Sequence, residues 1–316
     1  MSTRCLVRGS INVDEFFHVP SVVVPGETIS STNYERRAGG KDGEWLLESL
    51  NEYGVVIERI IRVEGEPTGR AIIQLTPEGE NCIILHRGAN YTSYPSDNVL
   101  STPFTHLLTQ NEIPFDSTLA ALSHAHSIGA TTIFNPSPMP SPSQLQTFPW
   151  TQLSWLIVNQ GEATSLLKAF AAHDVTAELR AAPKSWPKVK DVEHAYELLQ
   201  RLHLHPTFSP SINLVCTLGG LGVIALVNEL DEPVYVPAAK LDGPVRDTTG
   251  AGDCFTGYMV AELMRIQEER GREHSLSEED VKRVFGVATT AAGMCVQVPG
   301  AMESIPSARD VATKLS

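Results

Sequence analysis

Short runs of apolar and β-branched residues alternate with helical patterns along most of this chain, and this alternation limits the fold more than any other feature. We predict strands at 5–13, 71–75, 82–86, 106–109, 131–134, 155–158, 214–217, 223–227 and 234–236. Helical patterns occupy 118–128, 162–173, 192–203, 254–267 and 277–295. Strands separated by helices of this length form βαβ units, so the sequence predicts an α/β fold with a doubly wound, mostly parallel sheet flanked by helices.

Two segments interrupt this alternation. Residues 20–37 have turn signals but no helical pattern, and residues 71–86 read as a hairpin with apolar residues at alternate positions. They predict a small antiparallel β lid, inserted at about 11–37 and 67–87 into a single domain spanning 1–316. The lid would cover a site or form an oligomer contact. The alternative is that these are ordinary edge strands of a mixed main sheet.

Charge and cysteine content exclude several classes of partner. The 24 basic and 37 acidic residues give a net charge of −13, which argues against nucleic acid or an anionic membrane as partner. No apolar stretch approaches the roughly 20 residues that span a bilayer, and the N-terminus lacks a signal-peptide pattern. The 5 cysteines are far apart and read as reduced thiols. We therefore expect a cytoplasmic protein, with the nucleus as the second option.

The strongest chemical signal is the run Arg-Asp-Thr-Thr-Gly-Ala-Gly-Asp at 246–253, which leads directly into a helical pattern. The turn at Gly250, Ala251 and Gly252 removes side chains where an anion must approach and directs backbone N–H groups outward at the positive end of the helix. Such a turn stabilises charge on a transferring phosphoryl group, and Asp253 could accept a proton from an attacking hydroxyl. The alternative is a purely structural start to the helix.

Other polar or glycine-rich turns follow predicted strands. They lie at 9–14, 39–41, 159–162 and 217–222. An open α/β sheet binds ligands beyond the carboxyl ends of its strands, so we expect these turns to contribute to the same cleft.

These motifs, in this order over nearly the whole chain, resemble the ribokinase-like (phosphofructokinase-B-type) carbohydrate kinases. The 247–253 run is similar to the C-terminal signature of that family, and Gly-Gly-Lys at 39–41 to the start of its N-terminal signature. The resemblance implies ATP-dependent phosphorylation of the primary hydroxyl of ribose, Mg²⁺ bound with ATP, and K⁺ as an activating cation. It also implies a homodimer joined through the lid.

The resemblance also assigns roles to single positions. Asp253 matches the catalytic base, and the backbone of 250–253 matches the anion hole. The positions that line the sugar site are Asn12, Asp14, Gly39, Gly40, Lys41 and Glu112. Asn159 and Glu162 match a phosphate and magnesium motif. The nucleotide loop matches Thr217, Gly219, Gly220 and Gly222, with Thr248 beside it, and the potassium site matches Asp247, Thr249, Gly300 and Ser304.

The chain departs from the family pattern immediately after Lys41. In the family, Gly-Gly-Lys continues into Gly-Ala-Asn, a helix, a strand and a second helix, whereas here residues 42–55 look like that second helix. About 30 residues, the size of one helix and one strand, are therefore missing. A naturally short variant or an error in the gene model would both produce this.

The missing segment has two expected consequences. Loss of the motif's Asn, a sugar contact, costs about 1–3 kcal/mol of binding. Loss of an interior strand removes four or five buried apolar side chains worth roughly 1.5–3 kcal/mol each, which approaches the whole stability of a domain. We predict a poorly stable chain unless the helix at 43–53 moves into the vacated place and completes the sheet.

The leading hypothesis is thus a sugar kinase, with another pentose, a keto-sugar acid or a nucleoside as alternative acceptors. The second is a catalytically impaired nucleotide-binding homologue whose sugar site is damaged.

Several conspicuous side chains have structural explanations. The two His-x-His pairs, at 124–126 and 203–205, place their side chains on different helix faces and do not predict a metal site. Cys254 reads as a core residue, and Trp150, Trp155 and Trp186 as packing anchors. Residues 135–149 read as a surface loop.

Overall fold

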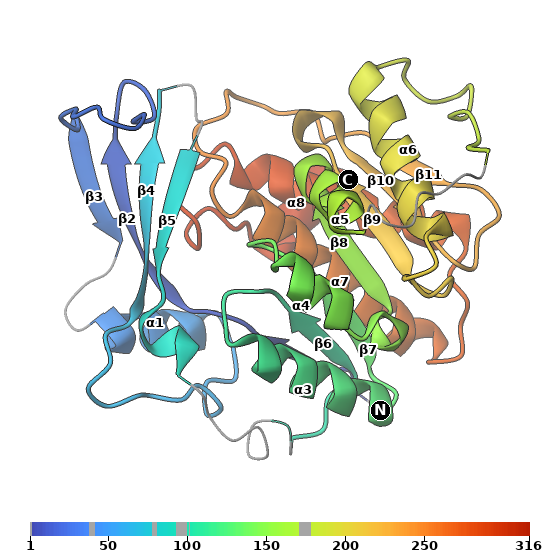
Figure 1. Ribbon diagram of the computed structural model, residues 1–316, viewed down its shortest axis with the longest axis horizontal. Helices are drawn as coiled ribbons and strands as arrows, with labels where there is room; N and C mark the ends of the chain where they lie inside the picture. The colour runs from blue at the N-terminus through green and yellow to red at the C-terminus, as the bar shows by residue number, and fades with distance from the viewer. Residues whose placement is uncertain (1, 38–41, 78–80, 93–99, 101, 171–177) are drawn as a thin grey trace.

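The computed structural model describes residues 2–37, 42–77, 81–92, 100, 102–170 and 178–316, and these form two sheets (Figure 1). The larger sheet has seven strands in the order β1-β6-β7-β8-β9-β10-β11, and the smaller has four in the order β3-β2-β4-β5. The strands are β1 (Cys5–Arg8), β2 (Asn12–His18), β3 (Asn33–Arg37), β4 (Gly69–Leu75), β5 (Asn81–His86), β6 (His106–Thr109), β7 (Thr131–Phe134), β8 (Trp155–Asn159), β9 (Asn213–Thr217), β10 (Val223–Leu226) and β11 (Val234–Val236). The helices are α1 (Asp42–Glu52), α3 (Phe115–Ser127), α4 (Pro142–Thr147), α5 (Gln160–Ala169), α6 (Lys190–Leu204), α7 (Ala251–Arg270), α8 (Glu278–Cys295) and α9 (Ala308–Leu315), with 3₁₀ turns η1 (Gly88–Tyr91), η2 (Trp150–Gln152) and η3 (Gly219–Leu221).

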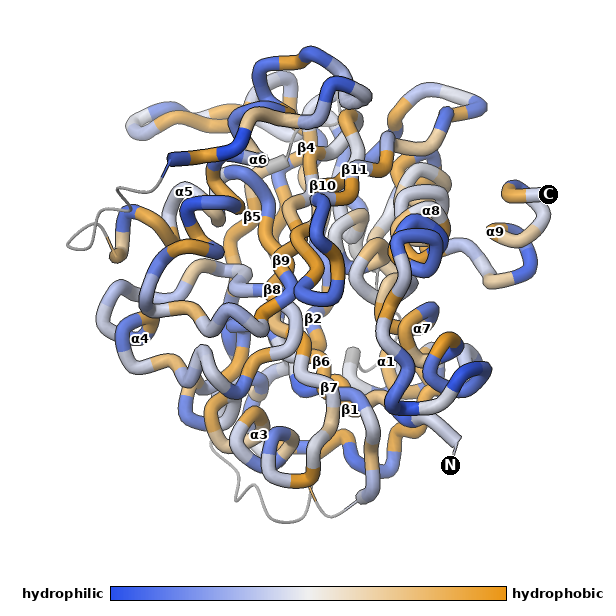
Figure 2. The backbone as a smooth tube through the Cα atoms, turned by 90° about the vertical axis from the view of Figure 1, so that its right-hand side faces the viewer, coloured by the Kyte–Doolittle hydropathy of each residue, from blue (hydrophilic) through white to orange (hydrophobic). Residues whose placement is uncertain are grey.

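The larger sheet confirms the predicted doubly wound architecture. It is parallel from β1 through β9, and β10 and β11 add antiparallel pairs at one edge. Along β8, Leu156 and Val158 pack with α3, α5 and α6, whereas Trp155 and Ile157 pack with α7 and α8. The strand is apolar throughout because both of its faces are buried. Hydrophobic positions accordingly gather in the interior around β9 and β10 (Figure 2).

The prediction of one strand at 5–13 is wrong. Residues 5–8 form β1 in the larger sheet, and residues 12–18 form β2 in the smaller one. Gly9, Ser10 and Ile11 lie between them outside either strand. The two halves of the predicted strand therefore belong to different sheets, because the chain leaves the larger sheet after Arg8 and enters the smaller sheet at Asn12.

The smaller sheet is the predicted lid, and it stands beside the body instead of forming edge strands of the larger sheet (Figure 1). The pairs β2–β3 and β4–β5 are antiparallel, as expected, but the central β2–β4 pair is parallel. A parallel pair needs a long connection. The connection here runs through β3, α1 and the turns that follow it. Phe16, Ala71, Ile73 and Leu75 form the small core of the lid.

Helix α1 does not complete the larger sheet. Among the described strands, β1 is an edge strand paired only with β6, and Val7 is 64% exposed. Figure 1 shows α1 at the lower end of the lid strands. The helix lies below the lid, where it buries Leu46. The low stability inferred from the missing segment stays a prediction.

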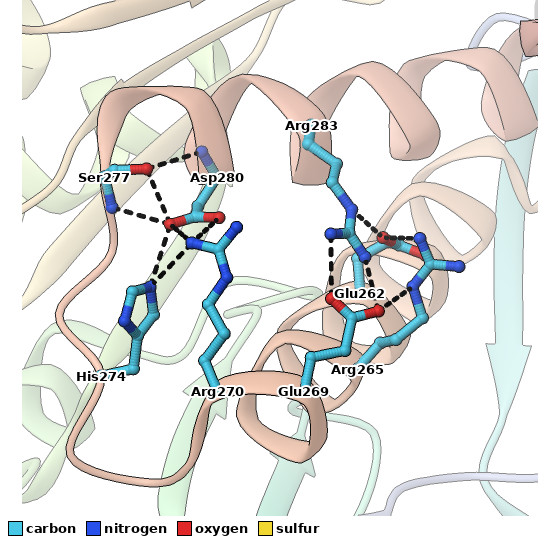
Figure 3. A network of polar contacts seen from close by, with 8 residues as sticks. All are labelled: Glu262, Arg265, Glu269, Arg270, His274, Ser277, Asp280 and Arg283. Carbon is cyan, nitrogen blue, oxygen red and sulfur yellow. Dashed lines mark hydrogen bonds and ion pairs between the residues drawn. The ribbon is translucent and has the colours of Figure 1, made fainter.

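Two polar clusters join α7 to α8 (Figure 3). In the first, the buried carboxylate of Asp280 accepts hydrogen bonds from Ser277 and contacts Arg270 at 2.9 Å and His274 at 3.1 Å. Burial raises the pKa of Asp280, but these hydrogen bonds and the charge of Arg270 outweigh it and lower the pKa to about 2. In the second, Arg283 pairs with Glu262 and Glu269. The clusters fasten α8 to α7, the helix that begins directly after the glycine turn at Gly250.

The remaining predictions have mixed outcomes. Residues 135–149 are not simply a surface loop, because they include α4 and bury Leu145 and Phe148 against the core. Trp150 and Trp155 are buried anchors, as predicted. Within the described ranges, no group of three or more His, Cys, Asp or Glu side chains could hold a metal ion. None of the helices in those ranges is long and apolar enough to cross a membrane.

Candidate active site

The glycine turn before α7 has the conformation expected of an anion-binding helix terminus. Gly250 is the N-cap with φ +75°, which favours glycine, and a Cβ there would lie 3.2 Å from Ala301 Cα. The amide of Cys254 makes the first helical bond, to Gly250 O at 2.8 Å. The amides of Gly252 and Asp253 precede that bond, and a Cβ on Gly252 would meet no atom within 4 Å. The turn therefore presents backbone donors to open space.

A cavity of about 370 Å³ lies between this turn and the lid. Its lining contains both polar and apolar side chains. The polar residues of the lining are Ser10, Asn12, Asp14, Gln110, Glu112, Thr249, Asp253 and Glu303. The apolar residues are Trp45, Leu46 and Leu50 from α1 together with Ala71, Ile73, Ile83 and Leu85 from the lid. The cavity thus brings the predicted base together with residues from α1 and from the lid strands β2, β4 and β5.

A network of hydrogen bonds orients the polar side chains of the lining. Glu112 Oε2 accepts from Ser10 Oγ at 2.5 Å and from Asn12 Nδ2 at 3.0 Å. Gln110 Nε2 donates to Ser10 Oγ at 2.9 Å. Asn90 donates to Asn12 Oδ1 at 2.9 Å and exchanges hydrogen bonds with the backbone of residue 11. Asn12 and Glu112 are therefore oriented before any acceptor binds.

Asp253 is open to water in the cleft, yet its pKa is raised. The protein that surrounds its carboxyl group disfavours the charged form, and the negative charge of Glu112 adds to this effect. A raised pKa makes the carboxylate a stronger base, which suits proton abstraction from a hydroxyl.

The predicted phosphate and nucleotide residues lie at the ends of β8 and β9. Asn159 and Glu162 form a reciprocal cap of α5, in which Glu162 Oε2 accepts from Asn159 N and Asn159 Oδ1 accepts from Glu162 N, both at 2.9 Å. Burial raises the pKa of Glu162, and hydrogen bonds from Asn159, Ser137 and Asn135 partly offset this. Thr217 ends β9, before η3 and Gly222.

Asp247 ties the phosphate turn to the loop after α8. Its carboxylate is 1% exposed and accepts from Thr249 N and Gly300 N, both at 2.9 Å. Ser304 Oγ donates to Ala301 O at 2.7 Å. In the described part of the chain, no Lys, Arg or His forms an ion pair with Asp247. A buried carboxylate in this setting fits a nearby cation, because isolated buried charge is costly.

The structure brings part of the predicted site together in one cavity. Asn12, Asp14, Glu112 and Asp253 line it, with Thr249 and Gly250 beside them. The nucleotide residues, Asn159, Glu162, Thr217, Gly219, Gly220, Gly222 and Thr248, are not among its lining residues. Gly39, Gly40 and Lys41 lie outside the described residues.

The sequence analysis missed several residues that the structure places in or next to the cavity. Ser10 belongs to the predicted turn at 9–14, whereas Gln110 was missed although it directly follows β6. Asn90 and Trp45 gave no such signal, because their roles depend on where η1 and α1 pack.

Fold and site together define an α/β phosphotransferase with a lidded acceptor cavity. A family model described as "pfkB family carbohydrate kinase" matches residues 29–308, and the chain therefore belongs to this family of carbohydrate kinases. The crystal structure of a ribokinase from Cryptococcus neoformans var. grubii serotype A in complex with ADP is 43% identical over 99% of both chains, with a TM-score of 0.84.

Two more distant relatives are also ribokinases. A ribokinase of Staphylococcus aureus (strain COL) is 24% identical over 98% of this chain and 99% of its own length. That alignment runs over 344 positions against 316 residues here, so at least 28 positions have no counterpart in this chain. The structure of Arabidopsis thaliana ribokinase complexed with ribose and ATP has a TM-score of 0.72 at 23% identity, covering 100% of this chain and 99% of that one, and shares the fold.

Proposed function

We propose that this sugar kinase transfers the γ-phosphoryl group of ATP to the primary hydroxyl of D-ribose, giving ribose 5-phosphate. One observation carries the proposal: a single cavity contains the Asp253 carboxyl group, the hydrogen-bonded Asn12–Glu112 pair, Asp14 and the open turn at Gly250. The resemblance to a ribokinase at 43% identity supports ribose as the acceptor.

The acceptor would lie with its hydroxyl groups toward the polar residues of the cavity lining. Amide and carboxylate groups can each bridge neighbouring hydroxyls, so Asn12, Asp14 and Glu112 suit a polyhydroxylated ligand. This places the primary hydroxyl at Asp253, which takes its proton as the oxygen attacks the phosphorus atom. Such base catalysis contributes about 10²–10⁴-fold.

The turn at the start of α7 would receive the transferring group. The amides of Gly252 and Asp253 and the positive helix end stabilise the charge that develops on its oxygens. Mg²⁺ bound with ATP neutralises phosphate charge, and the Glu162 carboxylate fits such an ion, held through water. Asn159, Thr217, Gly219, Gly220, Gly222 and Thr248 would bind the rest of the nucleotide.

K⁺ would activate the enzyme at the buried Asp247, with Thr249, Gly300 and Ser304. The ion would balance the charge of Asp247 and add positive potential behind the phosphate-binding turn.

The lid would join two copies into a homodimer. Its face away from the cavity exposes Tyr34 and Ile84, which are 48% and 55% accessible. Sedimentation of the purified chain tests whether it forms a dimer. We also propose that the enzyme is cytoplasmic.

The decisive test is ADP release by the purified chain with ribose, Mg²⁺ and K⁺. We expect turnover that depends on ribose, and Asp253→Asn should lower kcat about 10²–10⁴-fold while ATP affinity is retained. The same assay with another pentose, a keto-sugar acid and nucleosides ranks the alternative acceptors.

A second candidate is an impaired homologue that binds nucleotide without transferring phosphate. The departure from the family pattern after Lys41 favours it, because residues expected there would contact the acceptor. Tight ADP binding without turnover on any acceptor would establish this second function and refute the first.

A further inference from the structure

Two cysteine side chains meet in the core directly behind the proposed base. Cys254 follows Asp253 in the first turn of α7, and Cys295 is the last residue of α8. Both are nearly fully buried, at 2% and 0% exposure, in a cluster with Ala291 and Val311. The two thiols are close enough to shift each other's ionisation: Cys295 raises the pKa of Cys254, and Cys254 lowers that of Cys295. The proposed phosphoryl transfer uses neither of them.

The cysteine pair joins two segments that contribute to the site, the first turn of α7 and the segment that follows α8. Cys295 begins the segment that contains Ala301, Met302 and Glu303, which line the cavity. Its Sγ atom lies 3.0 Å from Ser304 Oγ in the same segment. This segment also packs on the phosphate-binding turn, since a Cβ on Gly250 would lie 3.2 Å from Ala301 Cα.

We propose that Cys254 and Cys295 are a redox-modification site, at which a peroxide joins the two thiols in a disulfide and so disables phosphoryl transfer. The loss of activity rests on the proposed function, whereas formation of the bond does not.

The reaction balances with hydrogen peroxide as the oxidant. The sulfur of one cysteine attacks a peroxide oxygen, the O–O bond breaks, and a sulfenic acid and one water form. The second sulfur then attacks the first, an S–S bond replaces the S–O bond, and a second water leaves. The two thiols lose two electrons and two protons in total, and the peroxide is reduced to two waters.

The bond would distort the site because it shortens the contact. A disulfide holds its sulfurs about 2.05 Å apart, which is closer than any hydrogen-bonded pair. The first turn of α7 and the end of α8 must therefore approach each other, and Asp253 moves with its neighbour Cys254. A misplacement of about 1 Å at reacting groups costs about 100-fold in rate.

The test oxidises the purified full chain with excess hydrogen peroxide, blocks remaining thiols with an alkylating agent and identifies linked peptides by mass spectrometry. We expect one linked species joining the peptides of Cys254 and Cys295, two hydrogen atoms lighter than their sum. ADP release with ribose should fall about 100-fold and return after treatment with dithiothreitol. Cys254→Ala and Cys295→Ala should each abolish the link and the peroxide sensitivity, whereas Cys82→Ser, at an exposed thiol in the lid, should retain both.

The outcomes separate formation of the disulfide from its effect on phosphoryl transfer. Absence of the linked peptide in wild-type protein, with Cys82 oxidised as proof of exposure to peroxide, would overturn the modification site. A linked peptide with unchanged turnover would overturn its effect on catalysis. A linked peptide in a chain that shows no turnover even when reduced would support the site and count against the proposed kinase.

Discussion

Gly69 faces Asn12 across the parallel pair β2–β4, and its missing side chain leaves room for the network that orients the acceptor site. A Cβ at Gly69 would lie 2.1 Å from Asn90 Nδ2 and 2.4 Å from Asn12 Oδ1. Ordinary contacts between such atoms start near 3.4 Å, so Gly69→Ala must move both amide groups by about 1 Å. That movement breaks the 2.9 Å hydrogen bond between Asn90 and Asn12 and misaligns the one from Asn12 to Glu112.

The cost follows from the number of bonds lost. Each buried hydrogen bond left unmade costs about 1–3 kcal/mol, so a loss of about 2 kcal/mol in acceptor binding is expected. This corresponds to a rise of about 30-fold in the KM for ribose. The assay is ADP release at saturating ATP, and the KM for ATP should stay unchanged.

Gly257→Ala in α7 is the matched control, because a Cβ there meets no atom within 4 Å and alanine favours a helix. A KM for ribose that stays within twofold of wild type in Gly69→Ala would show that the network does not position the acceptor.

Three further predictions concern other parts of the molecule. Glu112→Gln removes a negative charge beside Asp253, so the pKa of Asp253 should fall and the acid limb of the kcat/KM profile should move to lower pH; an unmoved limb would contradict this. Trp45→Ala removes an apolar wall of the cavity and should raise the acceptor KM roughly tenfold with the KM for ATP unchanged, as steady-state kinetics would show. Asp280 has its folded-state pKa lowered to about 2 from its usual value of 3.8, so its contribution of about 2 kcal/mol is present above pH 4 and disappears as pH falls toward 2. Urea unfolding of wild type and Asp280→Asn should differ by that amount at pH 7 and converge near pH 2.

The large sheet was predictable because its signals are local. The run at Trp155–Asn159 is apolar on every position before Asn159, and only burial on both faces of a parallel sheet accommodates such a strand. The glycine turn before α7 was predictable for the same reason, since its Gly-Ala-Gly run stands directly before a helical pattern in the sequence.

Features that depend on packing between distant segments were not predictable. The predicted strand at 5–13 is interrupted at Gly9 and Ser10, but only the register of β2 with β4 shows that its second half belongs to the lid. Likewise, Asn90 reaches the site because η1 packs on β4, and Cys254 meets Cys295 because α7 packs on α8.

The proposed phosphate half of the site is held by more buried contacts than the acceptor half, and this difference decides which half a missing segment would affect first. Asp253 and the phosphate-binding turn belong to α7, which packs on the large core beneath the seven-stranded sheet. Ser10 and Asn12 instead follow β1, an edge strand paired with β6 alone among the described strands, and lead into a lid whose core cluster contains four buried apolar side chains. Strands with few buried contacts open at lower free energy than the core. Loss of the segment predicted to be missing after Lys41 would therefore weaken the acceptor half first and leave the phosphate half in place, which is why nucleotide binding and sugar-dependent turnover are to be measured separately in this protein.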